Sequence, residues 1–409
     1  MAIGDIIVGV DIGTKKVTVV VGEINKFNQV EVICTSSSRC KGIKKSKIID
    51  EEALAESIEN AIKTAEIEAE IKINSAYTTI PGTYVTIVQN SITKEVKDKY
   101  TGISTRDVHT GINQVRDIEL PDDKVLIDII CNQFILENGE VLDDPVGRIS
   151  SSFTVNGQVI LADKEYIKQL SSVCRRAGIE VDGFTPTVLA QRNLVLDTNE
   201  LHDNVIILDV GAENTNIGAF EGNQFIYTNT IPVGGDNITN DIAYIMNIEE
   251  EEAEKLKKQY GLALKSLIDN DNDIILNTCK SENRTKNIKS SELIEIIEAR
   301  IEEIFSLVNK DISMQGFKPK INSVILTGQG ITNINKSDVA GKIILNIPVK
   351  VATGRLISTI KPEYRTSYAL VRYIALRPFT KTVSSSIDST VRENIIKRIL
   401  ARIREFFYS

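Results

Sequence analysis

Three short glycine-containing loops carry the residues of clearest chemical potential in this 409-residue chain. They read DIGTKK at 11–16, DVGAEN at 209–214 and TGQGIT at 327–332, and each follows an apolar run rich in β-branched residues, typical of a buried strand. A glycine after a strand lets backbone N–H groups approach an anion closely, and oriented amides form a phosphate-binding nest. The loops therefore predict a site for a phosphorylated ligand.

Two of these loops begin with an aspartate, Asp11 in the first and Asp209 in the second. Mg²⁺ prefers oxygen ligands and gives up its water reluctantly, so a carboxylate at a strand end is suited to hold it through water. One Asp-x-Gly after a strand is most simply a tight turn. Two matched copies with a third glycine loop instead favour a cleft that holds Mg²⁺ and phosphate beyond the carboxyl ends of the strands.

The residues around the two aspartates repeat one scheme, which indicates how the loops are positioned. Residues 5–35 and 203–230 both read as strand, Asp-x-Gly turn, strand, turn and strand. Because the copies lie about half a chain apart, they indicate two related α/β halves and not a solenoid of ~20–50-residue repeats. Helical spacing of apolar residues predicts helices at 51–70, 163–178, 248–261 and 290–312.

The three loops resemble the first phosphate, second phosphate and adenosine loops of the actin/Hsp70/sugar-kinase superfamily. Further segments resemble the FtsA family of actin-like bacterial cell-division proteins, in order and over nearly the whole chain. These segments are IPVGGDNITNDIA (231–243), EEAEKLKKQYG (251–261), CNQFIL (131–136), DPVG (144–147) and PEYRTSYAL (362–370).

This resemblance implies a two-lobed actin-like (ribonuclease H-like) α/β fold with an inserted small α+β subdomain and a C-terminal amphipathic helix. The implied domains are a first-lobe core at 1–82 (continued by 161–200 and 362–378), the inserted subdomain at 83–160, a second-lobe core at 201–236 (continued by 318–361), the small subdomain of the second lobe at 237–317, a flexible linker at 379–390 and a membrane-targeting helix at 391–409.

The resemblance also implies that the cleft binds ATP with Mg²⁺. Phosphate would be bound from the first lobe by Gly13, Thr14 and Lys15 and from the second by Gly211, Ala212 and Glu213. Gly234 and Gly235 would border the ribose and phosphate, Glu254 and Lys257 would reach adenine and ribose, and Gly328 and Gly330 would lie under the base. Asp11 and Asp209 would hold hydrated Mg²⁺. An exposed charged helix is the alternative interpretation of Glu254 and Lys257.

The second phosphate loop departs from the superfamily pattern Asp-x-Gly-Gly-Gly-Thr-x-Asp. This chain has Ala212, Glu213, Asn214 and Asn216 there, and Thr185 where members that hydrolyse ATP usually carry Glu or Gln before a proline. A glutamate beside phosphate would repel it unless its side chain points away. Thr and Asn orient an attacking water poorly, so we expect ATP binding with slow or absent hydrolysis.

The last residues, 391–409, form an amphipathic pattern after the Ser/Thr-rich stretch 379–390, which reads as a tether. One helical stripe is apolar and the remaining face is basic. The stripe comprises Ile395, Ile396, Ile399, Leu400, Ile403, Phe406 and Phe407, and the basic residues expected at the membrane are Lys397, Arg398, Arg402 and Arg404. This pattern favours a helix lying in the interface of an anionic membrane over one packed on the protein core or bound by a calmodulin-like partner.

Composition argues against several classes of protein and partner. The net charge of −8 argues against nucleic acid, since phosphate backbones reward basic surfaces. The five cysteines are scattered and form no C-x-x-C, which suits a reducing cytoplasm. We expect neither a secretion signal nor a transmembrane span, because no apolar stretch approaches the ~20 residues that a span requires.

The resemblance to FtsA implies a cell-division scaffold on the cytoplasmic face of the bacterial membrane, at the division site. It would assemble with itself, partly through 83–160, and bind the FtsZ C-terminal tail at about 237–317, so tethering FtsZ filaments. Two alternatives stay open. One is the related actin-like adaptor of pilus assembly, and the other is a small-molecule kinase, for which no catalytic base stands in a convincing loop.

Overall fold

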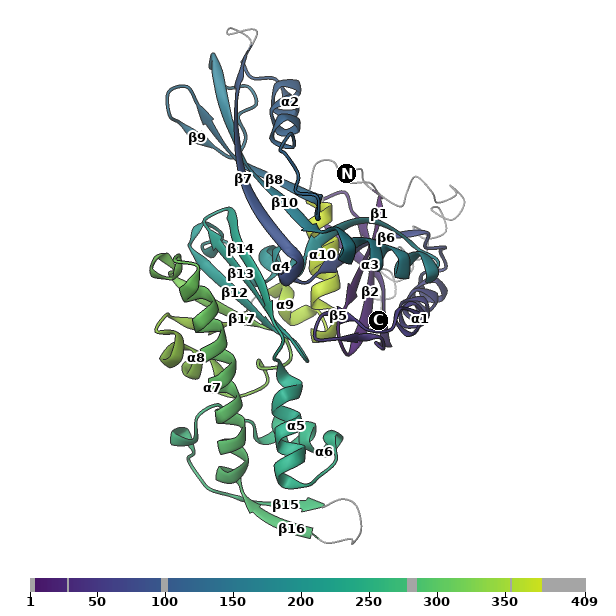
Figure 1. Cartoon of the computed structure of the whole chain (residues 1–409), viewed down its shortest axis with the longest axis vertical. Coiled ribbons are helices and arrows are strands. Elements are labelled where there is room, and N and C mark those ends of the chain that lie inside the picture. Colours follow the sequence, from purple (N-terminus) through teal and green to yellow (C-terminus); the bar gives the residue numbers. More distant parts are fainter. Residues whose placement is uncertain (1–3, 28, 97–101, 278–284, 354, 377–409) are drawn as a thin grey trace, which may run out of the picture.

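A computed structural model of the chain describes residues 4–27, 29–96, 102–277, 285–353 and 355–376. Figure 1 shows two lobes side by side, with an inserted sheet at the top and a mostly helical part below the second lobe. The predicted linker at 379–390 and the predicted membrane helix at 391–409 lie outside the described residues.

The first lobe is a five-stranded sheet in the order β11-β6-β1-β2-β3. The first three strands of the chain form an antiparallel meander, and β6 and β11 add in parallel beside β1. Helices α1 and α3 pack on one face, and α4 and α10 contribute to the core on the other. The bounds are β1 Ile6–Ile12, β2 Lys16–Ile24, β3 Val30–Arg39, β6 Ser75–Ile80, β11 Glu180–Pro186, α1 Glu51–Ala69, α3 Lys164–Arg176, α4 Thr187–Val195 and α10 Arg365–Ala375.

The second lobe repeats this topology with the order β14-β13-β12-β17-β18. Again a three-stranded antiparallel meander is extended by two parallel strands beside its first strand. The duplication predicted from the two Asp-x-Gly hairpins is therefore confirmed. The bounds are β12 Val205–Val210, β13 Thr215–Glu221, β14 Gln224–Ile231, β17 Ser323–Thr327, β18 Val349–Val351, α8 Ser337–Leu345 and α9 Arg355–Thr359.

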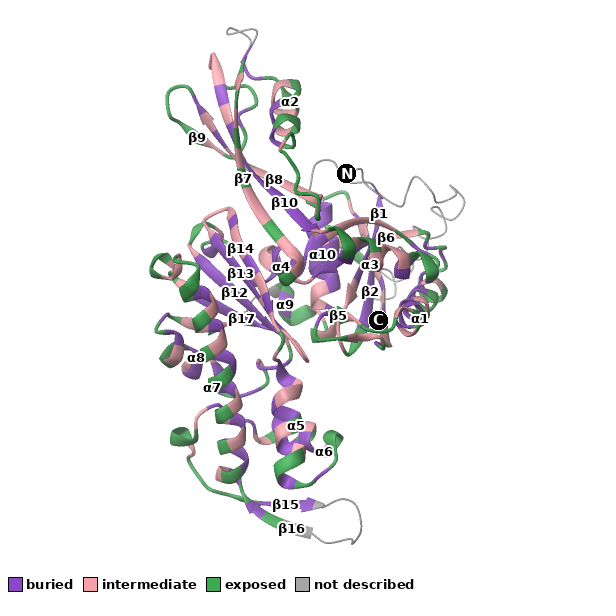
Figure 2. Ribbon diagram, viewed as in Figure 1, coloured by how far each residue is buried: buried purple, intermediate pink, exposed green. Residues whose placement is uncertain are grey.

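Burial explains why the apolar runs form the central strands. All six residues of β12 are buried, as expected for a strand covered on both faces. Figure 2 shows buried residues along the central strands of both large sheets and along α10. In the part of the chain that the structure describes, no helix is long and apolar enough to cross a membrane.

Local signals set the ends of several helices. Asp50 caps α1 by accepting hydrogen bonds from the amides of Glu52 (3.1 Å) and Ala53 (3.0 Å). A capping box of Ser104 and Asp107 starts α2 (Thr105–Val115), and Gly178 follows the end of α3 with a φ of 86°. Each of these signals lies within one or two turns of the helix end that it sets, so the sequence alone carries it.

The inserted part carries its own sheet, in the order β7-β10-β8-β9, and its own core with α2 packed on one face. It projects from the first lobe at the top of Figure 1. The strands are β7 Val85–Glu95, β8 Lys124–Leu136, β9 Val141–Leu142 and β10 Ser152–Asp163.

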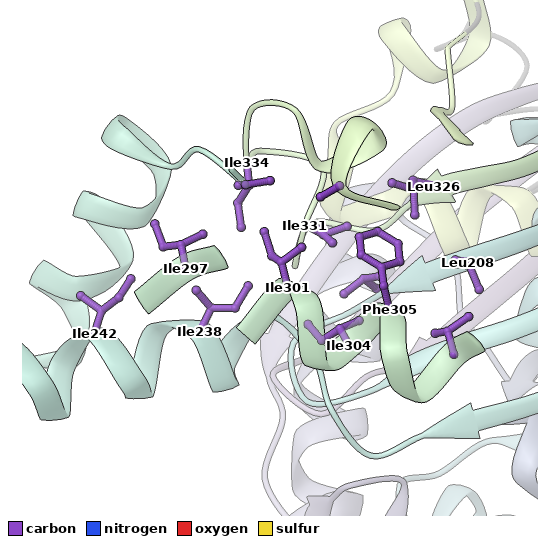
Figure 3. Packing of buried hydrophobic residues seen from close by; sticks show 14 of the residues in the cluster. Leu208, Ile238, Ile242, Ile297, Ile301, Ile304, Phe305, Leu326, Ile331 and Ile334 are labelled. Atoms are coloured by element: carbon purple, nitrogen blue, oxygen red, sulfur yellow. The ribbon is translucent and has the colours of Figure 1, made fainter. Parts of the chain in front are cut away.

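The lower part of the second lobe combines three helices with the small hairpin β15–β16. Figure 3 shows that Ile238, Ile301 and Phe305 belong to one continuous core running from these helices up to Leu208 and Leu326 of the sheet. The elements are α5 Gly235–Met246, α6 Glu250–Tyr260, β15 Asp273–Asn277, β16 Thr285–Lys289 and α7 Ser290–Met314.

Short elements complete the described chain. They are the hairpin strands β4 Ile43–Lys44 and β5 Lys47–Ile48 and the 3-10 turns η1 Gly82–Tyr84, η2 Glu200–His202, η3 Lys265–Leu267, η4 Lys318–Lys320 and η5 Pro362–Tyr364.

Candidate nucleotide-binding cleft

A cleft of about 400 Å³ opens between the two lobes, and all three glycine loops line it. Most of the residues predicted to bind nucleotide or metal meet there. They are Asp11, Gly13, Thr14, Lys15, Asp209, Gly211, Ala212, Gly235, Glu254, Lys257, Gly328 and Gly330. The remaining two, Glu213 and Gly234, are not among the lining residues.

The loops of the second lobe are packed backbone against backbone. The amide of Gly235 donates to the carbonyl of Gly211 (2.9 Å), and the amide of Gly330 donates to the carbonyl of Val210 (2.8 Å). A Cβ on Gly330 would overlap the Gly211 carbonyl oxygen, and Gly328 has a φ of 88°, which L side chains rarely adopt. The glycines thus create the close approach that a backbone cradle for an anion needs.

Gly330→Ala is expected to lower the free energy of unfolding by about 2–3 kcal/mol, because the new methyl group must push the two loops apart. The same displacement should weaken ATP binding. Thermal unfolding and ATP titration measure the two effects. Gly139→Ala is the control, since a Cβ there meets nothing within 4 Å and adds only the strain of a φ of 84°. Equal losses in both variants would contradict the packing argument.

Two carboxylates, those of Asp11 and Asp209, line the cleft. Thr79 Oγ1 donates to Asp11 Oδ1 at 2.6 Å, and Asp209 Oδ2 accepts from Gln191 Nε2 at 3.1 Å and Asn216 Nδ2 at 3.3 Å. Burial raises the pKa of Asp11 to about 6, a value that includes a smaller upward contribution from the nearby carboxylate of Asp209. Burial also raises the pKa of Asp209. Two desolvated carboxylates in one cleft are arranged to receive a cation.

The surroundings fit hydrated Mg²⁺ bound together with phosphate. In the described part of the chain no three His, Cys, Asp or Glu side chains form a complete metal cage. Mg²⁺ is usually held by one or two carboxylates, water and substrate phosphate, which is the set that Asp11 and Asp209 would complete. Gln191, whose Oε1 atom is buried and has no hydrogen-bond partner among the described residues, holds the Asp209 carboxylate through its Nε2 atom.

The N-terminus of α5 faces the cleft through Gly235 and Asp236. A helix N-terminus carries partial positive charge and favours an anion. Lys15 Nζ reaches across from the first lobe to Asp236 Oδ1 at 2.5 Å, with the lysine side chain 57% exposed. The ammonium of Lys15 is therefore held at the place where phosphate would lie, and a bound phosphate would compete with Asp236 for it.

Lys257 is buried, so the exposed-helix interpretation does not apply to it. Its Nζ donates to the Gly235 carbonyl (2.9 Å), Thr239 Oγ1 (2.8 Å) and Glu254 Oε2 (2.6 Å). Burial lowers the pKa of Lys257, while the Glu254 carboxylate opposes that change. Burial acts to raise the pKa of Glu254, but hydrogen bonds from Lys257 and Thr239 lower it to about 2. Because its three N–H donors are used, Lys257 fastens α6 to the start of α5.

Three residues of the sequence argument take unexpected positions. Glu213 points away from the cleft, and its Oε2 accepts a hydrogen bond from the Lys45 amide at 2.9 Å. Gly234 lies behind the lining, where its amide donates to Asn237 Oδ1 at 3.0 Å. Thr185 is 1% exposed and is not among the residues that line the cleft.

Sequence reasoning missed several polar residues in the cleft. Asp236 directly follows the paired glycines, so an acidic first helical turn was a usable signal. No local pattern marked the others, because they come from elements whose sequence carries no glycine loop. The missed lining residues are Thr79, Asp236, Lys258, Glu363 and Thr366. Gln191, which does not line the cleft, was also missed and donates to Asp209.

Solved structures share this architecture, and the fold is actin-like. The PilM-PilN type IV pilus biogenesis complex matches with a TM-score of 0.57 at 16% identity, covering 91% of this chain and 98% of that one. MreB5 of Spiroplasma citri bound to ADP matches with a TM-score of 0.54 at 12% identity, covering 96% and 98%. At these identities the likeness shows the fold alone.

Sequence comparison identifies the family. The model described as "Cell division protein FtsA" matches residues 206–369, and the model "SHS2 domain inserted in FTSA" matches residues 82–161. Curated proteins of the same name are 28% identical in Bacillus subtilis (90% of this chain, 83% of that protein) and 26% identical in Escherichia coli K12 (90% of each). The chain belongs to the FtsA family.

Proposed function

We propose that this protein is a cell-division scaffold that binds ATP with Mg²⁺, assembles with itself and holds FtsZ filaments at the membrane. The observation that carries the proposal is the cleft in which three glycine loops, two carboxylates and the N-terminus of α5 converge. Support for the cellular role comes from membership of the FtsA family, whose matched relatives are named cell division proteins.

In this proposal the nucleotide phosphates lie between the loops that carry Gly13 and Gly211, with Lys15 and the start of α5 as the positive partners. Asp11 and Asp209 hold Mg²⁺ through its water. Glu254, Lys258 and the loop at 328–330 line the part of the cleft left for ribose and adenine. The buried Lys257 supports this wall and donates no hydrogen bond to the nucleotide.

Hydrolysis is proposed to be slow at most. The carboxylate of Asp209 is already bound by the amides of Gln191 and Asn216. Asn216 carries no charge to activate water, and Glu213 is turned toward the other lobe. The site therefore suits a protein that uses bound ATP to hold its lobes together more than one that turns ATP over.

We place the FtsZ tail on the lower part of the second lobe, within 237–317. Tyr244 and Ile245 at the end of α5 are 87% and 59% exposed. One turn earlier, Asp241 accepts two hydrogen bonds from Arg300 of α7, from Nε at 2.6 Å and from Nη2 at 2.9 Å. An apolar pair beside an Arg–carboxylate pair is suited to a short peptide with both apolar and charged residues.

Binding of the full chain to a synthetic FtsZ C-terminal peptide tests the cellular role. Fluorescence anisotropy should show saturable binding, and Tyr244→Ser should weaken it about tenfold, since exposed aromatics carry much of the energy of such contacts. Tyr260→Ser, at a half-buried tyrosine of α6 that packs against the core, is the comparison variant in the same part of the lobe. No binding by the wild type would contradict the scaffold role and leave the pilus adaptor or the kinase as explanations of the fold.

We further propose that the protein lies on the cytoplasmic face of the membrane at the division site. The basis is the amphipathic pattern at 391–409, which is outside the described residues. Self-assembly is proposed by analogy with actin-like neighbours such as the MamK double helical filament, which matches with a TM-score of 0.51.

A further inference from the structure

The two-residue turn at 45–46 has an unusual backbone for its sequence. Strands β4 and β5 pair Lys44 with Lys47, so Lys45 and Ser46 form the whole hairpin loop. Both have positive φ, 47° and 65°. Tight turns with two positive φ angles strongly prefer Asn-Gly, and Lys-Ser in these positions costs conformational energy. Contacts elsewhere must offset that cost.

Those contacts come from the opposite lobe. Glu213 Oε2 accepts from the Lys45 amide at 2.9 Å. With the amide of Asn214 oriented to satisfy its neighbours, Asn214 Oδ1 accepts from Ser46 Oγ at 2.9 Å and from the Ser46 amide at 3.3 Å. Successive backbone N–H groups in a turn make a concave site for acceptors, and here Glu213 and Asn214 each accept from one of the two amides.

The turn is also anchored to its own lobe. Tyr84 Oη donates to the Ser46 carbonyl at 3.1 Å, and the Tyr84 ring stacks on Tyr166 with centroids 3.7 Å apart. Ser46 is only 5% exposed. The first lobe therefore presents a fixed pair of donors, and the second lobe meets them with two consecutive side chains of its phosphate loop.

From this geometry we infer that Glu213 is a positioning residue. Its hydrogen bond to the Lys45 amide of the first lobe, here called the clasp, holds the two lobes together and fixes the second phosphate loop in the position that binds nucleotide. Glu213 and Asn214 sit in the turn that begins with Gly211, so fixing them against the first lobe fixes the spacing of the two phosphate loops. This explains how an anionic residue stands in a phosphate loop, because its carboxylate accepts from the Lys45 amide of the other lobe and is directed away from the cleft. The inference rests on the proposed binding of ATP for its second half.

Amide hydrogen exchange in the nucleotide-free full chain tests the clasp directly. Glu213→Ala should speed exchange of the Lys45 amide about tenfold, since a hydrogen bond to a charged acceptor is lost. Glu213→Gln keeps an oxygen acceptor, so its exchange rate at the Lys45 amide should lie between those of the wild type and Glu213→Ala. Glu221→Ala, whose carboxylate contacts Lys320 Nζ at 3.1 Å on the same lobe, should leave segment 43–48 unchanged. Unchanged exchange in Glu213→Ala overturns the clasp.

The affinity for Mg·ATP, measured on the same variants, tests the positioning role. Glu213→Ala should raise the Kd about tenfold, because a smaller fraction of molecules has the lobes set for binding. If repulsion of phosphate were its main effect, both Glu213 variants would bind ATP more tightly, which would overturn the inference. Faster exchange with unchanged affinity overturns the positioning role. A wild type that binds no ATP refutes the proposed nucleotide function, and the exchange comparison then still decides the clasp.

Discussion

Deleting residues 391–409 should abolish sedimentation of the full chain with anionic liposomes. The segment carries seven apolar residues in one stripe, and its five basic and two acidic side chains give it a net charge of +3. Each basic residue near an anionic surface contributes about 1 kcal/mol, and insertion of the apolar face adds transfer free energy. Together they predict at least a 100-fold loss of membrane partitioning. Co-sedimentation with vesicles containing anionic lipid measures it.

Two variants separate the two forces. Ile399→Asp together with Ile403→Asp breaks the apolar stripe and should abolish binding to every vesicle. Arg398→Gln together with Arg402→Gln keeps the stripe and should weaken binding chiefly to anionic vesicles, with a smaller dependence on salt. Undiminished sedimentation after the deletion would show that this segment is not the membrane anchor.

Asp11→Asn should weaken binding of ATP in Mg²⁺ about 30-fold or more, because a desolvated carboxylate that faces the metal loses its charge. In EDTA the two proteins should differ much less. The substitution keeps the shape of the side chain and an oxygen that accepts from Thr79. Isothermal titration with and without Mg²⁺ measures the effect. Asp311→Asn, outside the cleft lining, is the control. Equal affinities for wild type and Asp11→Asn in Mg²⁺ would remove Asp11 from the metal site.

The same variant should be more stable than the wild type when no nucleotide is present. Burial raises the pKa of Asp11 to about 6, so the folded state holds this proton more tightly than the unfolded state does. The wild type therefore loses stability as the pH rises from about 4 to about 6, by about 1–3 kcal/mol, and the loss stays complete above that range. Asp11→Asn should lack this fall. Identical pH profiles of the melting temperature would contradict the pKa argument.

The fold was predictable where one strand or helix carried its own signal. The runs before Asp11 and Asp209 are apolar because β1 and β12 are central strands, and their repetition revealed the duplicated sheet. The β15–β16 hairpin is hard to find in the sequence because each strand has five residues and β16, Thr285–Lys289, has one apolar residue, Ile288, among polar ones. Short edge hairpins carry too little apolar periodicity to stand out.

Some residues of the candidate site were also predictable from the sequence, and others were not. Glycines and aspartates in the loops were found because backbone geometry and metal chemistry restrict residue type there. Gln191 was missed because an amide within a helix has no distinctive spacing. The sequence also left the exposure of Lys257 open, since a charged i, i+3 pair usually lies on a solvated face, and only the packing of α6 on α5 buries it. The direction of Glu213 depends on a turn some 170 residues earlier, which is beyond any local pattern.

Equilibrium dialysis of the full chain against labelled ATP in Mg²⁺ tests the central claim most directly, since that claim is one nucleotide site between the lobes. Saturation is expected near one ATP per chain, with binding weakened in Gly330→Ala and strongly weakened in Asp11→Asn. Binding that is absent from the folded wild type, or that both substitutions leave intact, would contradict it.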